Sequence, residues 1–200
     1  MDLGNDTVGV TAKHIFMILG ERRGLTSIDP GSGFMQWDLR SLKPGTQGME
    51  AVTLINRDPQ EPMGDFNSLK VRDWRVFDVA APGIVVLPLR VRSVPGGKGD
   101  TVYAGGRSQA NRQSPDPTIF PLRVYQALGP YYHVQALNPG ADPAGTSGSP
   151  VIDGGGLLIG LVSGAVGRLG VVSSLDYLMQ VLDHYGLQSV RSPSETRRDP

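Results

Sequence analysis

A serine lies in a short loop of small residues, Gly145-Thr146-Ser147-Gly148-Ser149-Pro150. A serine hydroxyl is a weak nucleophile at neutral pH, so it needs a neighbouring base and backbone donors for the oxyanion that forms. The glycine two residues before Ser147 lets the chain turn until the N–H groups of Gly145 and Ser147 point into one small pocket, and Gly148 leaves room for substrate. The loop is therefore compatible with acyl transfer by Ser147, and the alternative for the loop alone is a Gly/Ser/Pro turn between two strands. The nucleophile elbow Gly-x-Ser-x-Gly does not fit, because Ser149 stands at its last glycine.

The loop resembles the nucleophile loop Gly-Asp-Ser-Gly-Gly-Pro of chymotrypsin-like serine proteases, and other strings of that family precede it. Thr11-Ala12-Lys13-His14 resembles the segment that carries the general base. Asp78-Val79-Ala80 resembles the start of the aspartate strand, and Gly99-Asp100-Thr101-Val102 resembles the strand that opens the second barrel. These strings occur in the order His, Asp, Ser of that family. The chain is therefore similar to bacterial, disulfide-free, trypsin-like peptidases over roughly residues 7–185.

The resemblance implies a catalytic triad of Ser147, His14 and Asp78, with an oxyanion hole formed by the N–H groups of Gly145 and Ser147. His14 is expected to be the base, and the aspartate to fix the tautomer of its ring. The segment Ala81-Pro82-Gly83 departs from the continuous apolar run of the family. Asp73, five residues before Asp78, is therefore the alternative third member.

The resemblance also implies a peptidase that acts on protein or peptide substrates and has a side-chain pocket beside the nucleophile. In the family, the residue six positions before the serine forms the base of this pocket, here Ala141. The strand after the nucleophile supplies Ser163, Gly164 and Ala165. A pocket without a carboxylate does not offset the desolvation of a lysine or arginine, so we expect small or medium apolar residues before the cut. Asp142 is the alternative, as a pocket acid.

The composition excludes several classes of function. The 19 basic and 19 acidic residues cancel, so we expect no nucleic-acid partner. The chain has no cysteine, which removes disulfides, thiol catalysis and zinc sites of the cysteine type. We find no cofactor motif and no metal-ligand spacing. No stretch reaches the ~20 apolar residues of a membrane span, and the start lacks the basic region of a signal peptide. As it stands, the sequence indicates a cytoplasmic location.

The remaining pattern predicts an all-β fold of two six-stranded-type antiparallel barrels with a C-terminal helix. Strands are expected at 34–39, 51–55, 69–77, 84–91, 101–104, 122–127, 131–137, 151–152, 157–162 and 171–173. The helix follows Ser173-Ser174 and is closed by Gly186. We place the first barrel in 1–94, the second barrel and helix in 95–187, and a disordered tail in 188–200. The polar run 105–117 is expected to be a mobile loop without chemistry.

The first barrel lacks its first strand in this reading, because only Thr7–Val10 precedes the histidine string. An edge strand left unpaired recruits another strand. We therefore expect a start further upstream, a strand-donating partner, a homodimer, or an inactive protein. Two further classes of function stay open. One is a pseudoprotease that acts as a binding module, and the other is an esterase that uses the same triad.

Overall fold

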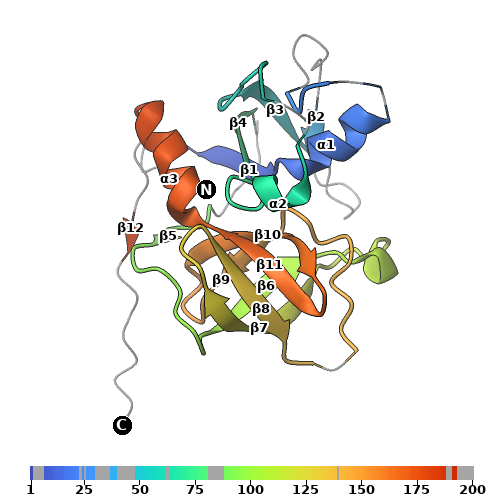
Figure 1. The fold of residues 1–200 in the computed structure, drawn as a ribbon, viewed down its shortest axis with the longest axis vertical. Helices are drawn as coiled ribbons and strands as arrows, with labels where there is room; N and C mark the ends of the chain where they lie inside the picture. Colours follow the sequence, from blue (N-terminus) through green and yellow to red (C-terminus); the bar gives the residue numbers. More distant parts are fainter. Residues whose placement is uncertain are drawn as a thin grey trace.

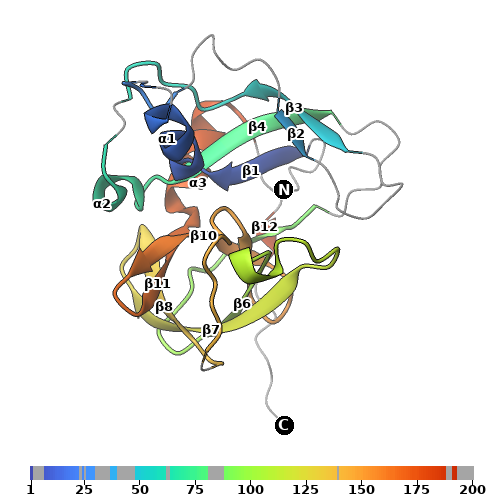
Figure 2. The same cartoon turned by 90° about the vertical axis from the view of Figure 1, so that its right-hand side faces the viewer.

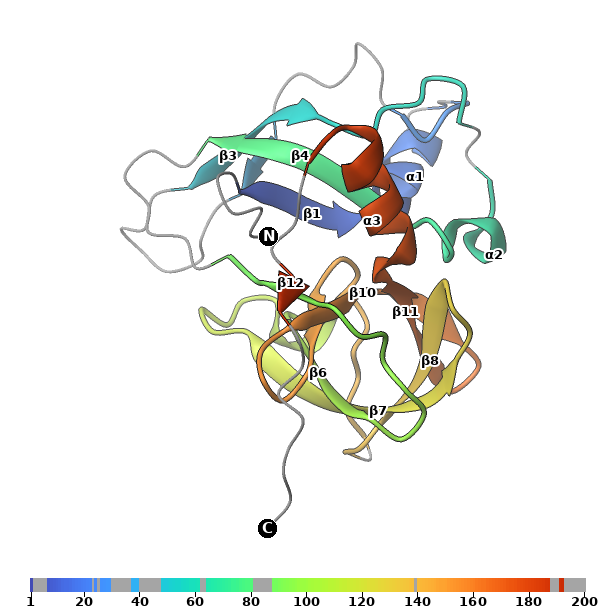
Figure 3. The same ribbon diagram turned by 90° about the vertical axis from the view of Figure 1, so that its left-hand side faces the viewer.

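The computed structural model describes residues 1, 7–22, 24, 26–29, 37–39, 48–61, 64–80, 88–138, 140–187 and 191–192. Two β-sheet units lie one above the other, and the C-terminal helix α3 (Leu175–His184) rises from the lower unit to the flank of the upper one (Figures 1 and 3). No helix in the described part of the chain is long and apolar enough to cross a bilayer.

The upper unit is a four-stranded half-barrel with strand order β1-β4-β3-β2 (Figure 2). Its elements are β1 (Val8–Ala12), α1 (His14–Glu21), β2 (Trp37–Leu39), β3 (Met49–Leu54), α2 (Phe66–Leu69) and β4 (Trp74–Ala80). β1 and β4 are antiparallel, with Val8 opposite Asp78 and Ala12 opposite Trp74. The residue after β1 therefore lies beside the residue before β4.

The lower unit is a closed barrel of the strands β6 to β11, completed where β10 pairs with β11. Its strands are β6 (Thr101–Gly106), β7 (Thr118–Ala127), β8 (Tyr131–Ala136), β9 (Pro150–Ile152), β10 (Leu158–Val166) and β11 (Leu169–Ser174). A 3-10 turn, η2 (Gln109–Asn111), follows β6. The expectation of an all-β, two-barrel architecture with a C-terminal helix is confirmed, and over the described residues the first unit is a half-barrel.

The structure differs from the sequence prediction in several places, and residues 34–36 and 84–87 of two expected strands lie outside the described residues. β5 (Val91–Arg92) pairs with β10, so it belongs to the second sheet although it precedes the expected boundary at 94. The strand expected at 69–77 is α2 followed by β4, because a turn after Leu69 separates them. Helix α1, directly after β1, was not expected. The tail 188–200 lies outside the described residues, except that β12 (Arg191–Ser192) pairs with β5.

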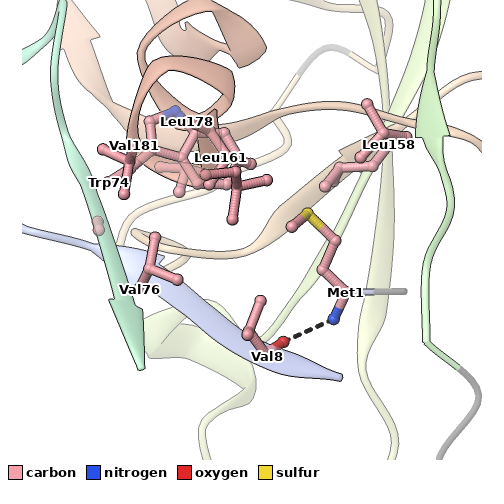
Figure 4. Close-up of a cluster of buried hydrophobic side chains, with 11 residues drawn as sticks. Met1, Val8, Trp74, Val76, Leu158, Leu161, Leu178 and Val181 are labelled. Atoms are coloured by element: carbon pink, nitrogen blue, oxygen red, sulfur yellow. Dashed lines mark hydrogen bonds between the residues drawn. The ribbon is translucent and has the colours of Figure 1, made fainter. Parts of the chain in front are cut away.

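Hydrophobic side chains form a core that the two units share. Val8, Trp74 and Val76 of the half-barrel pack with Leu158 and Leu161 of the barrel and with Leu178 and Val181 of α3 (Figure 4). Ser174 is the N-cap of helix α3, and its side chain accepts a hydrogen bond from the N–H of Asp176. The buried stripe of α3 thus joins the unit that carries His14 to the unit that carries Ser147.

Candidate active site

His14 is the first residue of α1, directly after β1, and its side chain is nearly buried. Its backbone N–H donates to Asp73 Oδ1 at 2.8 Å, and its ring Nδ1 lies 2.7 Å from Asp73 Oδ2. An ionised carboxylate only accepts hydrogen bonds, so Nδ1 is the donor. This leaves Nε2 as the ring nitrogen that can take a proton, which is what a general base requires.

Asp73 is fully buried at the position before β4, and it accepts a third hydrogen bond from Ser163 Oγ. Ser163 is itself buried on β10, so this contact connects the two sheet units. A buried carboxylate is costly unless hydrogen bonds satisfy its oxygens, and here both oxygens are satisfied. The carboxylate is therefore held in one orientation against His14.

The choice of Asp78 as the partner of His14 is wrong in this structure, and the alternative Asp73 occupies that place. Asp78 is exposed and pairs with Val8, at the far end of the β1–β4 ladder from His14. The physical reason is the antiparallel register, which brings the start of β4 to the end of β1. Asp78 was chosen because Asp78-Val79-Ala80 resembles the start of the aspartate strand of the family. Asp73 directly precedes β4 (Trp74–Ala80), whereas the sequence prediction placed this strand at 69–77, so no local signal favoured Asp73 over Asp78.

Ser147 lies in a tight loop whose conformation depends on two glycines. Gly145 has φ +90° and Gly148 has φ +81°, in the region that favours glycine. The N–H of Thr146 donates to Pro143 O at 3.0 Å, and that of Gly148 donates to Val162 O at 2.8 Å. Within the described residues, the N–H groups of Gly145 and Ser147 have no acceptor. Both donors are thus available to a ligand.

The loop packs directly against the segment that leads to His14. A side-chain carbon added to Gly148 would come within 3.0 Å of the backbone nitrogen of Ala12 and would overlap Thr11 Oγ1. Only glycine allows this approach without displacing β1. The nucleophile loop of the barrel and the histidine segment of the half-barrel are therefore neighbours.

A cavity of about 380 Å³ opens beside Ser147. Ala141, Gly164 and Ala165, which the sequence analysis assigned to a substrate pocket, are among the residues that line it. Ser163 does not, because its side chain is turned to Asp73. The deeper wall consists of apolar residues of the barrel, among them Phe120, Leu122, Val134 and Val172. Asp142 is exposed, and its carboxylate accepts a hydrogen bond from the N–H of Ala144 at 2.9 Å.

The comparisons with known proteins give a likeness of fold. No family model and no curated protein matches the sequence. Among solved structures, Glu endopeptidase in complex with MPD has a TM-score of 0.62 at 11% identity, over 90% of this chain and 81% of that chain. The active form of the Rv3671c protease from M. tuberculosis has a TM-score of 0.58 at 22% identity, over 92% and 71%. Kallikrein-related peptidase 10 in complex with Zn²⁺ has 0.57 at 14%, over 90% and 84%.

The fold is that of the trypsin-like serine proteases. In this protease fold, the described residues contain no group of His, Asp or Glu side chains that could hold a metal ion.

A buried ionic cluster lies next to His14 in this trypsin-like fold. The sequence analysis did not predict it. Lys13 is 1% exposed, and its Nζ donates to both carboxylate oxygens of Glu61, at 3.1 and 3.0 Å, and to the hydroxyl of Tyr177 at 3.3 Å. Arg72 also pairs with Glu61, at 3.3 Å. Tyr177 belongs to α3, so the cluster ties the start of α1 to the C-terminal helix.

A second buried cation lies inside the half-barrel. Arg75 is fully buried, and burial lowers the pKa of its guanidinium although Asp29 opposes this shift. Its Nη1 donates to Asn56 O at 2.7 Å, and the guanidinium lies over the ring of Phe16. The contact with Phe16 holds α1, which begins at His14, against β4, which directly follows Asp73.

Proposed function

We propose that the chain is a serine endopeptidase that hydrolyses peptide bonds through an acyl-enzyme on Ser147. The observation that supports this most directly is the buried pair of His14 and Asp73, which orients a histidine beside a glycine-bounded serine loop. His14 is the general base, Asp73 orients its ring, and the N–H groups of Gly145 and Ser147 form the oxyanion hole.

In the proposed mechanism, each group has a step in the reaction. Ser147 Oγ attacks the carbonyl carbon of the substrate while His14 Nε2 takes the hydroxyl proton. The carbonyl oxygen becomes an oxyanion and accepts hydrogen bonds from Gly145 and Ser147. The C–N bond then breaks, and His14 gives its proton to the leaving amine. A water molecule activated by His14 hydrolyses the ester in the second half of the reaction.

The cavity beside Ser147 supports a preference for small or medium apolar side chains before the scissile bond. Its lining is mainly apolar, with Ala141 at the position that the family uses for the pocket base, and its charged lining residues are Arg168 and Asp142. A cationic side chain buried there would lose its hydration without gaining a partner. The carboxylate of Asp142 caps the N–H of Ala144, so it is engaged within its own loop.

A fluorophosphonate probe tests the proposed activity. We expect the wild-type chain to be labelled covalently at Ser147, and Ser147→Ala to lose all labelling and turnover. Ser149→Ala is the matched control in the same loop and should keep the wild-type labelling rate. An unlabelled wild type would indicate a pseudoprotease, and labelling without any cleavage in a peptide library would indicate an esterase.

We also propose that the edge of β1 takes up an extended strand, from a partner polypeptide or from a second copy of this chain. The ammonium group of Met1 donates to Val8 O at 2.7 Å, and Val8 N–H donates to Met1 O at 3.2 Å. The polar backbone groups of Val8 therefore face away from β4, and the two-residue period of a strand directs those of Val10 to the same edge.

The surroundings of this edge suit an apolar strand. No described residue pairs with the backbone of Val10 on that side. A cavity of about 260 Å³ runs along β1 and is lined by apolar side chains that include Leu89, Leu158 and Leu161. A strand added there would gain backbone hydrogen bonds from β1 and bury its alternate side chains in this groove.

A further inference from the structure

The 3-10 turn η2 lies against the nucleophile loop, although sequence reasoning expected a mobile loop without chemistry there. The N–H of Gln109, the first residue of η2, donates to the carbonyl oxygen of Ala144 at 2.7 Å. A side-chain carbon added to Gly145 would lie 3.1 Å from both the nitrogen and the Cγ of Gln109. One added to Gly106, at the end of β6, would overlap the hydroxyl of Ser149. The β6–η2 segment is therefore packed on the loop that carries Ser147.

The bond from Gln109 acts on one peptide unit, the one that joins Ala144 to Gly145. In a trans peptide the C=O and the N–H point in opposite directions. With the carbonyl of Ala144 directed at Gln109, the N–H of Gly145 points away from η2 and has no acceptor among the described residues. This is the N–H to which we assign half of the oxyanion hole.

The same peptide unit has little else to hold its orientation. Gly145 has no side chain to restrict rotation, and Ala144 is exposed. The turn bonds of the loop, from Thr146 N–H and hydroxyl to Pro143 O, lie outside this peptide. If the peptide rotated by half a turn, the carbonyl of Ala144 would take the place of the N–H and would repel an oxyanion.

We propose that the backbone N–H of Gln109 is the positioning group of the oxyanion hole, so that the β6–η2 segment determines whether the serine site is competent. This inference rests on the proposed function. Gln109 does not touch the substrate and acts through the Ala144–Gly145 peptide. Loss of one oxyanion-hole donor lowers turnover on the order of 10²–10³-fold, which sets the size of the effect.

The chain offers a substitution that removes this donor and little else. Gln109 is the first residue of η2 and is exposed, and Ser108 before it is extended, with φ −75° and ψ 166°. Proline is accepted at the first position of a helical turn and after an extended residue. Gln109→Pro therefore deletes the N–H in a compatible backbone. Gln109→Ala deletes the side chain and keeps the N–H, so it is the matched control.

The experiment compares wild type, Gln109→Pro and Gln109→Ala by fluorophosphonate labelling rate, by kcat and KM on a library-selected peptide, and by thermal melting. We expect Gln109→Pro to lower the labelling rate and kcat by about 10²-fold or more, with KM within about 3-fold and an unchanged melting temperature. Gln109→Ala should stay within about 3-fold of wild type in every measurement.

The outcomes separate this inference from the proposed function. A wild type that does not react contradicts the proposed function, and the inference falls with it. If wild type and Gln109→Pro react equally fast with the probe, the inference alone is contradicted. The inference alone is also contradicted if Gln109→Ala loses as much activity as Gln109→Pro. If Gln109→Pro melts at a lower temperature than wild type, a second variant, Ala110→Gly, is used, because it loosens η2 without removing a donor. We expect Ala110→Gly to lower kcat several-fold at constant KM. A wild-type kcat in Ala110→Gly would overturn the inference.

Discussion

At the scale of single residues, the site depends on one carboxylate that accepts hydrogen bonds from two sheet units. Asp73 accepts from the backbone and ring of His14 and from Ser163, and no solvent reaches it. A carboxylate enclosed in this way cannot turn to a new partner without leaving a buried polar group unsatisfied. The orientation of the His14 ring is therefore determined by Asp73 and not by the histidine alone.

Exchanging this carboxylate for an amide tests its role. In Asp73→Asn the side chain keeps its shape but can donate to Nδ1, which places the ring hydrogen of His14 on the wrong nitrogen. We expect kcat to fall on the order of 10⁴-fold, measured with a peptide substrate alongside the melting temperature. Asp78→Asn is the control, and because Asp78 is exposed it should leave kcat within about 2-fold. A large loss in Asp78→Asn with an active Asp73→Asn would reverse the assignment.

The pocket base gives a second test at this scale. The wild-type chain should cleave after small or medium apolar residues, and Ala141→Asp should shift the profile toward lysine and arginine because the new carboxylate supplies their missing partner. Cleavage of a peptide library by both proteins measures the shift. Asp142→Asn should keep the wild-type profile. A wild-type preference for basic residues that Asp142→Asn abolishes would show that Asp142 is the pocket acid.

At the scale of elements, β1 has two edges with different functions. One edge is paired with β4 and aligns His14 with Asp73, and the other edge carries the outward backbone groups of Val8 and Val10. Proline is tolerated in a strand only where its missing N–H is not part of a ladder. The two edges can therefore be distinguished by proline substitutions one residue apart.

We expect Val10→Pro to fold with nearly wild-type stability, because its N–H points to the open edge. Thr11→Pro should lose about 1–3 kcal/mol, since it removes a ladder bond and leaves a carbonyl of β4 unsatisfied. Urea unfolding measures the free energy of unfolding of both proline variants. Thr11→Val shows how much of the loss in Thr11→Pro comes from the missing hydroxyl. If the open edge takes up a second copy, wild type dimerises with concentration in sedimentation experiments and Val10→Pro does not. Equal loss of stability in both proline variants would contradict this description of the edge.

At the scale of the whole molecule, the two sheet units share one core and one site. Helix α3 buries Leu178 and Leu182 among residues of both units, and Trp74 Nε1 of the half-barrel donates to Ser174 O at 2.8 Å. The contact of Ser163 with Asp73 crosses the same boundary. Separation of the units would break the contact of Ser163 with Asp73 and the core together, so we expect one cooperative unfolding transition.

Truncation of a buried side chain of α3 tests this coupling. Leu178→Ala removes a fully buried side chain and should cost about 2–5 kcal/mol. Serine labelling and tryptophan fluorescence should be lost at the same temperature in the variant, as in wild type. Tyr185→Ala, at an exposed position of the same region, should leave the melting temperature nearly unchanged. Two separate transitions in Leu178→Ala would show that the units unfold independently.

The sequence by itself located the segments that form the candidate site. The histidine string and the serine loop could be found from their residue types and their order, and Gly145 and Gly148 in that loop have positive φ. The succession of short segments with alternating apolar and polar residues likewise predicted an all-β fold, because this alternation can be recognised from neighbouring residues alone. The amphipathic helix after Ser174 was found for the same reason.

Tertiary structure alone decided which groups meet. Asp73 and Asp78 both lie near an apolar strand, and only the antiparallel register of β1 and β4 separates them, because register is set by partners distant in the chain. The same holds for Ser163, which faces Asp73 rather than the pocket, for the burial of Lys13 against Glu61, and for the bond from Gln109 to Ala144. Each of these contacts joins segments tens of residues apart, so its geometry follows from packing and leaves no local signal in the sequence.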